Sequence, residues 1–208
     1  DFDPDQVVAL AARYLGSLPQ RGAIVEGATR PAPQFPVGDS LRLTAETTID
    51  KALVAVSYPT TDFWNIGRTR RLNVLAELFS ERLRVRIREK LGAAYSPYAY
   101  HHAFRAYQGY GLLQAVFLVD PRQADAIVTE TKTIVDEITS QGISEDELRR
   151  ALDPTLTQIK DLRQSNTYWI TSVLVGSTRH PEQLAWARSI EADYAAIRVA
   201  EMNALAKQ

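Results

Sequence analysis

Apolar residues recur at intervals of three and four along the middle of the chain. This spacing places them on one face of a helix, so the pattern predicts a long helix from about residue 65 to residue 90. Residues 82–88 alternate arginine with apolar residues, which is typical of a half-buried strand. Helix is favoured because the helical series continues through this stretch and Gly92 stands where a left-handed cap is common. The series is Leu72, Leu75, Phe79, Leu83, Ile87 and Leu91.

Alternating apolar and polar residues predict strands on both sides of this helix. Residues 41–45 and 52–58 come before it, and a turn near residues 49–50 would join them as a hairpin. Residues 94–104 and 109–119 come after it and are separated by a short turn. Strand pairs joined in this way predict an antiparallel sheet.

Further helices are predicted from their start signals. Aspartate followed by proline begins a helix at Asp3 and again at Asp120. Residues 144–147 form a capping box that begins another helix, in which Pro154 predicts a kink. The remainder, residues 167–208, predicts three shorter helices.

These elements indicate the α+β class, with an antiparallel-rich sheet and helices packed on one of its faces. Residues 17–38 hold four prolines and little periodicity, which is typical of a linker. We therefore expect residues 1–20 to be the terminal helix of a preceding domain, residues 21–38 a linker and residues 39–208 one α+β domain. Since the chain begins at Asp1 without methionine, we expect it to be part of a longer protein.

Composition excludes several classes of protein. The 208 residues carry a net charge of −1, so no overall field attracts nucleic acid or an anionic membrane. No apolar run approaches the roughly 20 residues of a membrane span. There is no cysteine, which removes disulfides, thiolate nucleophiles and thiolate metal ligands.

The chain shows no catalytic equipment of its own. His101 and His102 are adjacent on a predicted strand and point to opposite faces, and His180 precedes a proline, so none has the four-residue spacing of a helical zinc pair. The nucleophile motif G-x-S-x-G and a glycine-rich phosphate loop are both missing. We therefore expect no metal or cofactor in this chain and no enzymatic activity from it alone.

Two clusters have an ordinary structural explanation. Seven arginines on the long helix, diluted by glutamates, are interpreted as a solvated helix face and not as a nucleic-acid site. Six aromatic residues around the last two strands are interpreted as sheet core and not as a stacking platform. The arginines are Arg68, Arg70, Arg71, Arg82, Arg84, Arg86 and Arg88, and the aromatic residues are Tyr95, Tyr98, Tyr100, Phe104, Tyr107 and Tyr110.

Arg88 and Tyr95 are the remaining candidates for a site. They lie seven residues apart across the turn from the long helix to the next strand. On local physics they are a helix-terminal cation and a strand aromatic. Alternatively, both point into a groove, where a guanidinium fork and a phenol donate hydrogen bonds to the carbonyls of a peptide.

Several segments resemble the pitrilysin/insulinase family of zinc metallopeptidases, specifically its non-catalytic, zinc-free domain. The segment Arg88-Glu-Lys-Leu-Gly-Ala-Ala-Tyr95-Ser carries the resemblance. It extends to residues 109–111 and 142–148, while residues 1–5 and 14–19 resemble the end of the domain that precedes it.

The resemblance implies half of a clamshell that encloses a peptide-degrading chamber. The zinc-bearing homologous domain, on the same polypeptide or a partner subunit, would hold zinc and do the chemistry of a zinc metalloendopeptidase. Arg88 and Tyr95 would bind the peptide substrate; no zinc ligand carries over onto this chain. An alternative within the related folds is a structural scaffold domain without peptidase activity. The compartment stays open, and the bacterial periplasm is compatible with the resemblance.

Overall fold

A computed structural model describes residues 2–20, 33–90 and 97–208, with the backbone alone at residues 88–90. The chain divides into two compact units, residues 1–32 and 33–208. The first contains α1 (Pro4–Tyr14). Its start is the one predicted, because an Asp3 carboxylate oxygen accepts from the backbone N–H of Asp5 at 2.9 Å.

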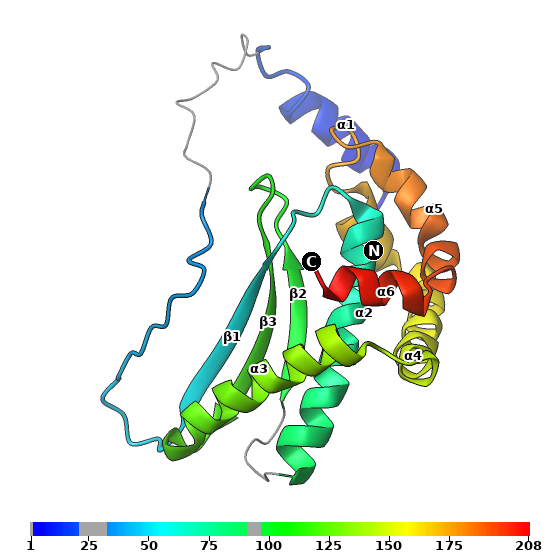
Figure 1. Cartoon of the computed structure of the whole chain (residues 1–208). Helices are drawn as coiled ribbons and strands as arrows, with labels where there is room; N and C mark the ends of the chain where they lie inside the picture. Colours follow the sequence, from blue (N-terminus) through cyan, green and yellow to red (C-terminus); the bar gives the residue numbers. More distant parts are fainter. Residues whose placement is uncertain (1, 21–32, 91–96) are drawn as a thin grey trace. The chain divides into compact units, whose positions relative to one another are not determined.

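The second unit is built on a sheet of three antiparallel strands. These are β1 (Ala52–Thr60), β2 (Tyr98–Ala103) and β3 (Gly111–Val119), and β3 lies between the other two. Figure 1 shows them side by side, with β1 and β2 at the edges. Alternate side chains face the helices, as Val54, Ala99 and Phe117 do in the core.

The strand predicted over residues 41–45 is wrong. This segment is irregular, and Leu41 and Leu43 are each 81% exposed. β1 instead pairs with β3, which comes much later in the chain. Alternation alone does not make a strand; the backbone needs a ladder partner and the apolar side chains need a surface to cover.

The long helix is confirmed, with a change of winding near its end. α2 (Ile66–Leu83) is capped at its start by Asn65, whose side chain accepts from the N–H of Arg68 at 3.0 Å. It passes directly into the π-helix η1 (Arg84–Lys90). Leu83 and Ile87 are fully buried, so the apolar face predicted from the sequence continues through the change. π-Helices are rare in proteins, and those that do occur are often found at functional sites.

The remaining helices follow β3 in the predicted order. Gly142, at φ 82°, ends α3, and Ser144 with Glu147 forms the predicted capping box of α4. Pro154 lies inside α4, and the kink expected there stays a prediction. The bounds are η2 (Pro121–Gln123), α3 (Ala124–Gln141), α4 (Glu145–Gln164), η3 (Tyr168–Leu174), α5 (Glu182–Ala195) and α6 (Val199–Ala206).

One core joins the sheet to the helices. α2 packs mainly against β2 and α3 against β1; α4 and α5 pack against α2, and α6 packs against both α2 and α3 (Figure 1). Phe79 of α2, Phe117 of β3 and Ile127 of α3 are essentially inaccessible to solvent within this core. The opposite face of the sheet carries exposed side chains such as Leu53 and Leu118. The predicted α+β class, with helices on one face of an antiparallel sheet, is confirmed.

Candidate functional site

The predicted site lies where η1 leads into β2. The backbone of Arg88 belongs to the last turns of η1, and its side chain is outside the description. Tyr95 lies outside the described residues, three positions before β2 begins at Tyr98. The relative placement of the guanidinium and the phenol therefore stays a prediction, and the residues on either side give its structural setting.

Both ends of this connection are anchored to the core. Ile87 is fully buried on one side, and Pro97 and Ala99 are buried on the other. The Ser80 hydroxyl accepts from the Ala99 N–H at 2.7 Å and donates to the Ala99 carbonyl at 3.0 Å. Thus α2 holds the first residues of β2 by a two-way hydrogen bond, and the residues carrying Arg88 and Tyr95 join two fixed points.

The arginines close to the connection are ion-paired, so their interpretation as a solvated face is wrong. Arg82 donates to Glu147 at 2.9 Å and to the carbonyl of Gly142 at 2.7 Å, which ties α2 to the start of α4. Arg86 lies 2.6 Å from Glu130 and 2.7 Å from Glu137 of α3. The hydrogen bond to Glu137, followed in size by the one to Glu130, raises the pKa of Arg86 above its ordinary value.

Arginines near the start of α2 are also buried and paired. The Arg70 side chain is 5% exposed and donates to Asp193 at 2.9 Å and to the carbonyl of Trp186 at 2.7 Å. Arg71 lies 2.8 Å from Glu201 and 3.2 Å from Asp193. A hydrogen bond from Arg71 lowers the pKa of Glu201. These contacts join α2 to α5 and α6, so they contribute to the fold and are not offered to an external anion.

A groove of about 840 Å³ runs beside η1, between α2, α3 and α4. Its wall includes Val85, which is 38% exposed. The charges along it are largely matched, for example Arg82 with Glu147 at 2.9 Å. Because opposite charges already meet along the groove, it shows no preference for an ion of either sign.

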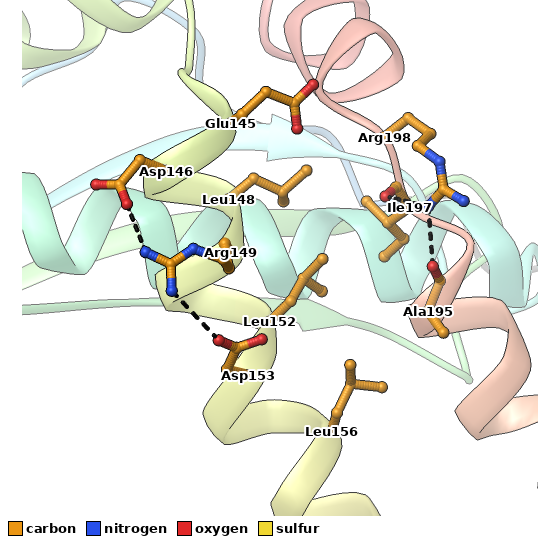
Figure 2. A pocket seen from close by; sticks show the side chains of 10 residues that line it. All are labelled: Glu145, Asp146, Leu148, Arg149, Leu152, Asp153, Leu156, Ala195, Ile197 and Arg198. Atoms are coloured by element: carbon orange, nitrogen blue, oxygen red, sulfur yellow. Dashed lines mark hydrogen bonds and ion pairs between the residues drawn. The ribbon is translucent and has the colours of Figure 1, made fainter.

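A second groove, of about 650 Å³, lies on another face of α4 (Figure 2). Leu148, Leu152 and Leu156 point from α4 toward Ile197, between α5 and α6. At its edge Arg149 lies 2.6 Å from Asp146 and 3.8 Å from Asp153, all on α4. The floor is largely buried, and Arg149 lies between the carboxylates of Asp146 and Asp153 at the rim.

His101 and His102 lie on opposite faces of β2, as predicted. His101 faces α2, where its Nδ1 lies 3.0 Å from Oδ1 of Asn73 and its Nε2 lies 3.2 Å from Oγ1 of Thr60. Burial, followed by the charges of His102 and Arg68, lowers the pKa of His101 to about 4. His102 instead contacts the ring of Phe104, at 4.3 Å between centroids. Among the described residues, no group of three or more histidines and carboxylates could hold a metal ion.

The aromatic residues of this region lie outside the core, which corrects the sequence interpretation. Tyr98 is 51% exposed and Tyr107 is 45% exposed. Tyr100, Phe104 and Tyr110 are half-buried, and Tyr95 is outside the described residues. The place of Tyr98 and Tyr100 on the open face of the sheet could not be predicted, because alternation along β2 separates two faces without telling which of them meets the helices. The role of Ser80 was also missed, since a serine within a helix carries no local signal for a bond to a strand.

Comparison with known families decides the identity of the fold. The family model described as the peptidase M16 inactive domain matches residues 1–154. The chain belongs to this family. This match confirms the resemblance of the chain to the pitrilysin/insulinase peptidases that was predicted from its sequence.

Known relatives of the M16 inactive domain are proteases or protease-like proteins. The probable zinc protease PqqL of Haemophilus influenzae is 27% identical over 177 residues, which cover 77% of this chain and 17% of the relative. The crystal structure of the periplasmic protease PqqL from Escherichia coli has a TM-score of 0.72 at 21% identity, over 100% of this chain and 23% of that one. The ferredoxin protease FusC, solved with Arabidopsis ferredoxin, has a TM-score of 0.69 at 17% identity, over 100% of this chain and 22% of that one. The M16 inactive domain described here thus spans about a fifth of these relatives.

None of the helices in the described part of the chain combines the length and the apolar composition that crossing a bilayer requires.

Proposed function

We propose that this M16 inactive domain holds the peptide substrate of a zinc peptidase and does not itself break the bond. Membership in the inactive-domain family carries the proposal. It is supported by the donor set, since no described cluster of side chains fits a metal ion. The domain closes a chamber opposite a zinc-bearing domain, on the same polypeptide or on a partner subunit.

Arg88 and Tyr95 are the proposed peptide-binding residues. A guanidinium presents several N–H donors in a rigid fork, and a phenol presents one directed O–H donor. Both suit backbone carbonyls, which every peptide carries whatever its sequence. Donors of this kind fix the position of the peptide, and correct positioning of reactants lowers the barrier of a reaction carried out elsewhere.

The anchored connection supports this role. Ile87 is fixed in the core before Arg88, and Ala99 is fixed to Ser80 after Tyr95. Two donors on a segment with fixed ends lose less conformational freedom on binding than donors on a free loop. In the proposal, α2 and η1 form the rigid support of this segment, because Arg82 pairs with Glu147 of α4 and Arg86 pairs with Glu130 of α3.

The parent protein is proposed to be a zinc metalloendopeptidase, with zinc held by the partner domain. This rests on the relatives named zinc protease and periplasmic protease. The same relatives support a bacterial periplasmic location for the parent. They say nothing of which peptide is cleaved.

Residues 1–20 are proposed to complete a preceding domain, with residues 21–38 as the linker. The support comes from α1, which has no buried residue within its own unit. Val8 is 66% exposed and Leu15 is 68% exposed, although both belong to the apolar series of an amphipathic helix. An apolar helix face of this kind is stable in water when another surface covers it.

Steady-state kinetics of the full-length parent protein test the proposal. Arg88→Ala and Tyr95→Phe should each lower kcat/KM on the order of 100-fold, because losing one donor in a preorganised site costs about 3 kcal/mol. Zinc content and melting temperature should stay at the wild-type values, because neither side chain binds the metal.

Arg149→Ala is the control, since it removes an exposed arginine that pairs with Asp146 and Asp153 of its own helix, α4. Its kcat/KM should stay within about twofold of wild type, as expected for exposed ion pairs. Wild-type turnover in both Arg88→Ala and Tyr95→Phe would overturn the proposal. It would favour the alternative role of a structural scaffold domain.

A further inference from the structure

The backbone winding changes shortly before one of the proposed peptide-binding residues. Hydrogen bonds join residues four apart in α2 and five apart in the π-helix η1. Each residue of a wider turn adds a smaller rotation about the helix axis. The winding of η1 therefore decides the direction in which the helix presents position 88, whose backbone belongs to η1.

Arg86 ties η1 to α3 through both terminal nitrogens of its guanidinium. Its Nη1 donates to Glu130 at 2.6 Å, and its Nη2 donates to the two carboxylate oxygens of Glu137 at 2.8 and 2.7 Å. Glu130 and Glu137 lie two turns apart on α3, about 10 Å along its axis. Because one side chain binds two separate turns of α3, a rotation of η1 about its own axis would break these bonds.

The bonds of Arg86 are made in a largely enclosed place. The side chains of Arg86, Glu130 and Glu137 are 26%, 26% and 29% exposed. Charges at this depth are screened by salt less than charges on the surface. Since both terminal nitrogens already bind carboxylates, Arg86 holds the helix and is not offered to a peptide as a ligand.

The next residue holds η1 from another side. Ile87 is fully buried in the core, so the two residues directly before position 88 are fixed to different parts of the domain. Arg82 also forms an ion pair, with Glu147 of α4, but it belongs to α2, where the winding has not yet changed. Among the arginines with described ion pairs, Arg86 is therefore the one best placed to control the end of η1.

We propose that Arg86 is a positioning residue for peptide binding, which holds η1 in the winding that presents Arg88 to the peptide. The inference rests on the proposed function and adds to it a residue that does not touch the substrate. A misplacement of about 1 Å can slow a reaction on the order of 100-fold. Arg86→Met keeps the donor of Arg88 and removes its support, so a smaller loss is expected than from Arg88→Ala.

Steady-state kinetics of the full-length parent protein, measured as a double-mutant cycle, test the inference. Arg86→Met should lower kcat/KM about tenfold when Arg88 is present. In the Arg88→Ala background it should lower kcat/KM less than about twofold, because the donor that it positions is already gone. Glu130→Gln is a milder variant that keeps the size of the side chain, and it should lower kcat/KM about threefold, again only when Arg88 is present.

Arg163→Met is the matched control. Arg163 of α4 lies 3.1 Å from Glu191 of α5, so this change also removes an arginine that joins two helices, away from η1. Its kcat/KM should stay within about twofold of the wild type, although the melting temperature falls in both Arg86→Met and Arg163→Met.

Two results would overturn the inference. One is a kcat/KM within about twofold of the wild type in both Arg86→Met and Glu130→Gln. The other is an equal loss with and without Arg88, which would assign Arg86 to general stability. Failure of the proposed function gives a different result: Arg88→Ala alone would leave kcat/KM at the wild-type value, and the inference would fall with it.

Discussion

The hydroxyl of Ser80 binds both backbone groups of Ala99. The N–H and C=O of one strand residue point to the same side, so Ala99 directs both groups away from β3 and toward α2. An unpaired strand edge invites addition of another chain. Ser80 occupies this point of the β2 edge and also fixes the strand immediately after the segment that carries Tyr95.

Ser80→Ala should therefore destabilise the protein by about 1 to 2 kcal/mol, because two backbone groups lose their partner in a half-buried position. Chemical denaturation measures this change. Ser140→Ala is the matched control: its hydroxyl donates to a carbonyl on the exposed surface of α3, and the change should stay within about 0.5 kcal/mol. Equal effects of the two substitutions would show that Ser80 does not hold β2.

Arg70 and Asp193 form the most buried ion pair that the structure describes. Arg70→Met should cost about 3 kcal/mol, since removing one partner leaves an incompletely compensated charge. Adding Asp193→Leu should cost less than the sum of the two single changes, by at least about 1 kcal/mol, because the two residues are in contact. Strict additivity in denaturant unfolding would contradict this account of the pair.

The neutral form of His101 should make stability depend on pH. Its pKa is about 4 in the folded protein and 6.5 when exposed. The unfolded chain therefore binds more protons between these values, and stability is lost as pH falls from 6.5 toward 4. The full difference corresponds to about 3 kcal/mol, and roughly half of that is expected for a partly accessible ring.

Thermal unfolding between pH 7 and pH 4.5 measures this effect. His101→Asn should remove most of the pH dependence in this window, because it keeps a polar group and cannot titrate. Paired carboxylates such as Glu147 and Glu201 begin to contribute as pH approaches their ordinary pKa of 4.5, so the slopes of wild type and variant are compared above about pH 5.5. An unchanged slope in His101→Asn would show that His101 is not the group responsible.

Local signals in the sequence were sufficient for the helices and their starts. The periodic series from Leu72 to Ile87 and the capping box at Ser144 depend on neighbours within a few residues, and both were predicted correctly. Residues 41–45 had the alternation of a strand, yet a strand also depends on a distant partner, and β1 pairs with β3 instead.

The candidate site was predictable only in part. Arg82 and Arg70 looked like surface cations because their partners, Glu147 and Asp193, lie 65 and 123 residues further along the chain. Tyr98 and Tyr100 were mistaken for core, because sequence alternation does not say which face of a sheet the helices cover. The family resemblance supplied the roles of Arg88 and Tyr95, which local physics left open.

Peptide binding by the zinc-free parent protein tests the central claim most directly. After zinc is removed with a chelator, cleavage should stop, while the dissociation constant for a peptide should change less than about threefold. In this zinc-free protein, Arg88→Ala and Tyr95→Phe should each raise the dissociation constant at least about tenfold, equivalent to 1.4 kcal/mol. If both variants bind the peptide as tightly as the zinc-free wild type, this domain does not hold the substrate.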